Sequence, residues 1–120
     1  MHMEIGAKGL QEVNLTIPQS TSLTFDVVHT DEEGNVFDHS ASTARMAFQS
    51  KDKQTTYVLD SCVSCAADKV RVTIPASMTE SLPLGKMLWD IIVTTESGEQ
   101  VRICYGNVTV VDTYAFDEEG

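Results

Sequence analysis

The sequence lacks long apolar runs, although 42% of its 120 residues are hydrophobic. No stretch approaches the roughly 20 consecutive apolar residues that cross a bilayer. The amino end, MHMEIGAKG, has no basic region followed by an apolar core, so we expect no cleaved secretory signal, and Met-His-Met resembles a cloning scar. These absences predict a soluble chain with no membrane partner.

Basic residues are scarce. Eight Lys and Arg residues stand against eighteen Asp and Glu residues, and the formal net charge is −10. Such a charge repels phosphate backbones and anionic membranes at distances that salt does not screen. We therefore expect no nucleic acid among the partners.

Cysteine is also scarce, since only Cys62, Cys65 and Cys104 occur. Three thiols are too few for a disulfide framework, which predicts folding in a reducing cytoplasm. The CVSC spacing resembles half a zinc site or a redox pair, but no second CxxC, HxxxH or βαβ pattern accompanies it. The plainer interpretation is a turn between two strands. A metal-dependent or redox enzyme remains an alternative, and it requires the fold to bring all three cysteines together.

Helical periodicity is almost absent, and period-two alternation recurs instead. It predicts seven strands, near 13–17, 23–27, 44–48, 56–59, 70–74, 87–93 and 101–110. Turn signals every eight to twelve residues favour an all-β, immunoglobulin-like antiparallel sandwich. We expect a single domain over residues 1–120, with its core at about 11–112 and loose ends at 1–10 and 113–120.

Two local features refine this prediction. In the last strand the apolar positions change from odd (101, 103, 105) to even (108, 110), which predicts a β-bulge at Gly106. Between the fifth and sixth strands, Ser77-Met78-Thr79-Glu80 predicts one helical turn capped by its hydroxyl groups. This turn places Met78 and Leu82 over the end of the sandwich.

The sequence contains no nucleophile motif, zinc-protease motif or glycine-rich phosphate loop, so we predict no enzyme and no cofactor. His2, His29 and His39 are scattered. His29 ends a strand and His39 lies in a loop, and we interpret both as surface residues rather than members of a catalytic triad.

The segment DEEGN presents alternating oxygen donors at Asp31, Glu33 and Asn35, and Asp38 follows. This fragment resembles part of a calcium loop, but the distal bidentate Glu is missing at the required offset. A solvated turn in which Gly34 and Asn35 supply positive φ explains these residues more simply, and we predict no metal site.

Three aromatic residues, Phe37, Tyr114 and Phe116, lie outside the alternating strands and are candidate partner contacts. Local packing over the ends of the sandwich is the alternative interpretation. A carbohydrate-binding or host-adhesion module is an alternative function, although the one tryptophan, Trp89, is predicted to point inward.

The second half carries a family resemblance. The segment VTIPASMTESLPLG at 72–85, Trp89-Asp90-Ile91 and GNVTV at 106–110 resemble the small immunoglobulin-like domain of tailed-phage structural proteins. That group includes the amino-terminal domain of a baseplate upper protein. Thr43-Ala-Arg-Met46 looks like the third strand of the family, so the resemblance covers roughly residues 20–111. Met87 and Trp89 depart from it, because tyrosines are usual at these positions.

The resemblance implies a non-enzymatic component of the virion. The component is a module of the tail or baseplate, of a head fibre, or of a capsid decoration. Its expected partners are other virion proteins and copies of itself. Its expected location is the virion, after synthesis in the cytoplasm of the host bacterium. The resemblance supplies no catalytic residues.

Overall fold

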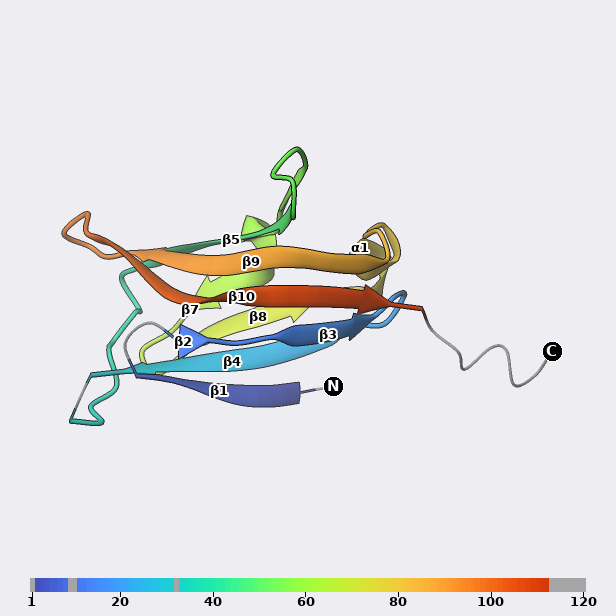
Figure 1. Cartoon of the computed structure of the whole chain (residues 1–120). Helices are drawn as coiled ribbons and strands as arrows, with labels where there is room; N and C mark the ends of the chain where they lie inside the picture. The colour runs from blue at the N-terminus through green and yellow to red at the C-terminus, as the bar shows by residue number, and fades with distance from the viewer. Residues whose placement is uncertain (1, 9–10, 32, 113–120) are drawn as a thin grey trace.

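Two β-sheets pack face to face in the computed structural model, which describes residues 2–8, 11–31 and 33–112 (Figure 1). The first sheet has the order β1 (His2–Lys8), β4 (Leu23–Thr30), β8 (Val70–Ile74) and β7 (Val63–Cys65). The second has the order β2 (Gln11–Glu12), β10 (Gln100–Val111), β9 (Gly85–Thr94), β5 (Thr43–Ser50) and β6 (Thr56–Val58), and β3 (Leu15–Pro18) also pairs with β10. The predicted immunoglobulin-like, all-β sandwich is confirmed.

The strands expected from the sequence correspond to β3, β4, β5, β6, β8, β9 and β10. Pairing is antiparallel except at the amino end, where β1 runs parallel to β4 and both β2 and β3 run parallel to β10. Residues 2–8, which we expected to form a loose end, are therefore an edge strand. The other expected loose end, 113–120, lies outside the described residues.

Within the described ranges, helix is confined to two short segments, η1 (Asp60–Cys62) and α1 (Ala76–Glu80). No helix in the described part of the chain has the length and apolar character that crossing a bilayer requires.

The core lies between the sheets, where the alternating side chains meet. On β9 the inward residues are buried and their neighbours are partly exposed; the buried ones are Met87, Trp89, Ile91 and Val93. Phe25 of β4 contacts Trp89 edge-to-face, with ring centroids 6.0 Å apart and an interplanar angle of 84°. This aromatic pair joins the two sheets and confirms that Trp89 points inward.

The predicted position of the β-bulge is wrong. The register of β10 against β9 shifts between Arg102 and Cys104, and Ile103 and Cys104 are both buried. The irregularity therefore precedes Gly106, and Tyr105 turns to the outer face of the sheet, where it is partly exposed.

Gly106 is required by a close approach of two backbones. A Cβ at this position, where φ is +157°, would overlap the carbonyl oxygen of Val13. That oxygen accepts a 2.8 Å hydrogen bond from Trp89 Nε1, and the Val13 amide donates to the Tyr105 carbonyl at 2.8 Å. Only glycine leaves room for this junction between β2, β3 and β10.

The helical turn before β9 is confirmed, but its expected hydroxyl caps are not. The N-cap of α1 is Pro75, and no side chain caps the helix. The buried Thr79 hydroxyl instead donates to the Thr21 carbonyl at 2.7 Å, which ties the turn to the connection between β3 and β4. Leu82 is buried and Met78 is half-buried against the core, as expected.

The other sheet carries a cross-strand ion pair on its outer side. Asp26 of β4 and Arg71 of β8 are register partners. The guanidinium donates through Nε at 2.7 Å and through Nη2 at 3.0 Å to the two carboxylate oxygens. The charge of Arg71 is thus matched within its own sheet.

We predict that Gly106→Val lowers the free energy of unfolding by roughly 1–3 kcal/mol, because the new side chain must displace the Val13 backbone. Urea unfolding provides the measurement. Thr109→Val, a substitution at a partly exposed position of the same strand, serves as the control and should change stability by less than about 0.5 kcal/mol. Equal stability of the two variants would show that the junction tolerates a side chain.

Candidate docking surfaces

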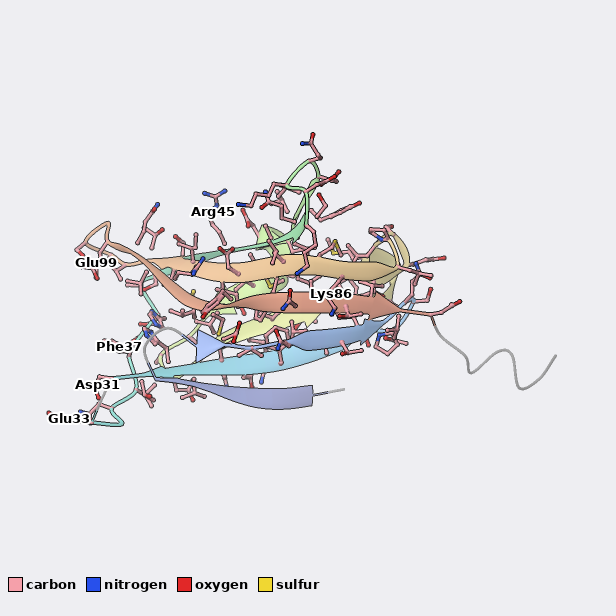
Figure 2. The ribbon with its side chains drawn as sticks, in the orientation of Figure 1. Asp31, Glu33, Phe37, Arg45, Lys86 and Glu99 are labelled. Carbon is pink, nitrogen blue, oxygen red and sulfur yellow. The ribbon has the colours of Figure 1, made fainter. Side chains whose placement is uncertain are left out.

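One end of the sandwich gathers acidic side chains around an exposed aromatic ring. We call this surface the loop end and define it by Asp31, Glu33, Phe37, Asp38, Glu96 and Glu99. The first four come from the connection between β4 and β5, and the last two come from the β9–β10 hairpin. Figure 2 shows Asp31, Glu33, Phe37 and Glu99 together at this end. The two loops enclose a shallow depression of about 440 Å³ that Phe37, Asp38 and Glu96 help to line.

Phe37 rests on a buried histidine pair. Its side chain is 44% exposed, and its ring stacks on His29 with centroids 4.4 Å apart. His29 Nδ1 lies 3.0 Å from His39 Nε2, and the two rings are nearly parallel, at 5°. His39 Nδ1 in turn lies 3.2 Å from Ser42 Oγ. These contacts hold Phe37 on a rigid base.

The prediction that His29 and His39 are surface residues is wrong, because they are only 6% and 4% exposed. His29 continues the inward-facing series of β4 after Phe25 and Val27. The His39 amide donates to the Ala66 carbonyl at 3.2 Å, which draws its loop over the end of the sheet.

Burial lowers the pKa of both imidazoles below the ordinary value of 6.5. The nearby His39 lowers the pKa of His29 further, whereas Asp38 partly opposes the shift of His39. At neutral pH the rings are therefore uncharged, so one N–H can donate to the partner nitrogen across the 3.0 Å contact.

The DEEGN segment is a turn. The Asp31 carboxylate accepts the backbone N–H groups of Glu33 and Asn35, each at 2.9 Å, and these bonds help to lower its pKa. Gly34 has a φ of +89°, as expected, but Asn35 does not have positive φ. Among the described residues, no group of three or more potential ligands could hold a metal ion.

The three cysteines are free thiols at separate places in the fold. The predicted turn at CVSC is wrong, because Cys62 ends η1 and Cys65 ends β7. Cys62 Sγ lies 3.4 Å from Met78 Sδ, and Cys104 is fully buried on β10. Burial raises the pKa of all three thiols, that of Cys104 to about 12, so they stay protonated at neutral pH.

A second surface carries most of the chain's eight basic residues. We call it the outer face; it is the exposed side of β5, β9 and β10 with the β5–β6 hairpin, and its cations are Arg45, Lys51, Lys53, Lys86 and Arg102. Strand register places Arg45, Ile92 and Arg102 in one row across the sheet. Figure 2 shows Arg45 projecting outward from this sheet.

The outer face is hollowed by a depression of about 360 Å³. Ala47, Leu88 and Tyr105 give it an apolar part, and Lys53 and Arg102 also line it. The Arg102 guanidinium lies 4.6 Å from the centroid of the Tyr105 ring, and its Nη1 is 3.9 Å from Asp90 Oδ2. The β5–β6 hairpin rises beside the sheet in Figure 1 and supplies Lys53 as part of the wall.

The structure describes one of the three aromatic residues predicted to contact partners. Phe37 is exposed, and its role stays a prediction, while Tyr114 and Phe116 lie outside the described residues. Sequence reasoning missed Tyr105, because the misplaced bulge assigned it to the core. Arg102 has the outward parity of the predicted strand, but nothing local singled it out.

The fold defines a class, the immunoglobulin-like β-sandwich. No family model matches the chain. No curated protein matches it either. Among solved structures it resembles the N-terminal domain of phage TP901-1 ORF48, with a TM-score of 0.52 and 9% sequence identity. The match covers 90% of this chain and 98% of that domain. At this identity the likeness establishes a shared fold.

We predict that stability falls as pH drops from about 7 to about 5.5. Both histidines have folded-state pKa values below 6.5, so the unfolded chain binds more protons in this range. The stabilisation that the two neutral histidines provide is therefore present above pH 6.5. It is lost as the pH falls through their folded-state pKa values. Urea unfolding at several pH values measures the slope. His39→Gln replaces the imidazole with an amide that can still hydrogen-bond but cannot titrate. The stability of this variant should therefore depend less steeply on pH, and equal slopes would contradict the assignment.

Proposed function

We propose that the chain is a non-enzymatic structural protein of a bacteriophage virion that acts by binding other virion proteins. The tail or baseplate, a head fibre and a capsid decoration are the candidate locations. The observation that carries the proposal is the fold shared with a phage protein's N-terminal domain over almost the whole of both chains. The resemblance of residues 72–110 to tailed-phage structural domains supports it independently.

The loop end has the features of a protein-docking surface. An exposed aromatic ring surrounded by polar groups is typical of an interface anchor. The stacking of Phe37 on His29 limits the motion of its side chain before binding. Docking therefore costs little additional conformational entropy at this residue. The acidic neighbours Asp31, Glu33 and Asp38 favour a partner with a basic rim and an apolar recess.

Carbohydrate binding is the second candidate function, because the outer-face depression combines Tyr105 with the polar groups of Gln49 and Asp90. Sugar-binding sites present an aromatic face to the ligand. The Arg102 guanidinium already covers one face of Tyr105, which favours protein docking over sugar binding.

We predict that Phe37→Ala weakens binding to virion particles at least about tenfold, as expected for loss of an aromatic anchor. The measurement is co-sedimentation with purified capsids, and separately with purified tails, of the phage that encodes the chain. Leu84→Ala, which removes another exposed apolar side chain at the opposite end of β9, is the matched control and should leave binding unchanged.

Failure of the unsubstituted protein to bind either fraction would count against a virion role. Glycan binding that is lost with Tyr105→Ala would instead favour the carbohydrate alternative.

A further inference from the structure

Charge is distributed unevenly over this acidic chain. The loop end carries five carboxylates, whereas the outer face carries five of the chain's eight basic residues. Arg71 does not add to the basic surface, because Asp26 holds it in a bidentate ion pair. The outer face also carries the carboxylates of Asp52, Asp60 and Asp90, so its five cations exceed its carboxylates by two. Among the described residues the loop end is therefore negative and the outer face is weakly positive, an arrangement that steers two complementary surfaces together.

Much of this charge is not matched within the molecule. Among the described residues, the carboxylates of Glu33, Glu96 and Glu99 make no ion pair, and neither do the ammonium groups of Lys53 and Lys86. Lys51 donates to the neutral Asn107 Oδ1 at 2.6 Å. The two outer-face ion pairs are long, at 3.7 Å for Arg45 to Asp60 and 3.9 Å for Arg102 to Asp90. Exposed pairs at such distances contribute little and can be exchanged for intermolecular ones.

The outer-face depression also has room for an aromatic ring. A cavity of about 150 Å³ accommodates a benzene ring. The outer-face depression, at about 360 Å³, is large enough for the exposed Phe37 ring. Leu88, Ala47 and Tyr105 would contact the ring. The cations Lys53 and Arg102 line the depression together with one carboxylate, Asp90, and would face the acidic residues beside Phe37. An apolar centre with a charged rim is the usual anatomy of a protein interface.

We infer that copies of this chain associate head to tail, with the loop end of one copy on the outer face of the next and Phe37 in the depression. The inference rests on the proposed structural role and names a second copy as a partner. The two surfaces occupy different parts of one molecule, and the contact uses one from each copy. The interface is therefore heterologous, so repeated contacts build a ring or an open chain.

Light scattering tests this inference on the full chain. At about 20 mM salt the average mass should rise with protein concentration above the monomer mass of 13.2 kDa. At about 0.5 M salt, where the Debye length is only a few ångströms, the mass should return toward that of the monomer. A constant monomer mass at low salt across the concentration range would overturn the inference.

Two sets of variants separate the surfaces. Phe37→Ala removes the anchor, and the double variant Lys53→Glu with Arg102→Glu reverses the rim of the depression. Each should weaken self-association at least about tenfold, whereas Leu84→Ala should not. An unchanged circular dichroism spectrum and melting temperature show that each variant is folded.

Mixing the two defective proteins gives the sharpest result. Each retains one working surface, so an equimolar mixture should form a dimer that grows no further. A mixture that stays monomeric would overturn a head-to-tail contact. A protein that is monomeric alone but binds purified capsids or tails would overturn this inference and leave the proposed function standing. Self-association without particle binding would count against the proposed function alone.

Discussion

The buried N–H of Trp89 sets the constraint on which the rest of the structure depends. An indole inside a core must find an acceptor, and here it donates to the Val13 carbonyl at 2.8 Å. The carbonyl reaches it only because residue 106 has no side chain. This junction fixes the start of β3 against β10 and so completes the second sheet. Trp89 and Gly106 also line the outer-face depression.

The two surfaces are supported by rigid elements in different ways. The outer face is a regular sheet, and strand register fixes the row of Arg45, Ile92 and Arg102. The loop end is irregular, but the buried pair of His29 and His39 connects it to the core. A rigid support fixes the geometry of a binding site and lowers the cost of ordering it on association. Protonation of the histidines links this support to pH.

Local alternation in the sequence was sufficient to predict most of the sandwich, because each core strand buries every second residue. The inward position of Trp89 followed from it. The burial of His29 was also readable, since the residue extends the odd series of Leu23, Phe25 and Val27. The bulge was misplaced because Cys104 was not counted among the apolar positions. As a result, Tyr105 was assigned to the core and its role on the outer face was missed.

The features that sequence reasoning could not supply depend on pairing between distant segments. The alternation of Met3, Ile5 and Ala7 is a weak strand signal, and nothing local specifies a parallel partner in β4. The basic outer face likewise arises because the sheet order brings β5, β9 and β10 together from three parts of the chain. The acidic composition as a whole gave no sign that cations gather on one side.

The central claim is that Phe37 docks into the outer-face depression of another copy. Replacing Phe37 with a photo-reactive benzophenone amino acid and mapping the crosslinks by mass spectrometry tests it most directly. The account predicts crosslinked dimers in which residue 37 is joined to β5, β9 or β10 near Leu88 and Tyr105 of the second copy. Crosslinks confined to the same chain, or directed to the sheet of β4, β7 and β8, would contradict it.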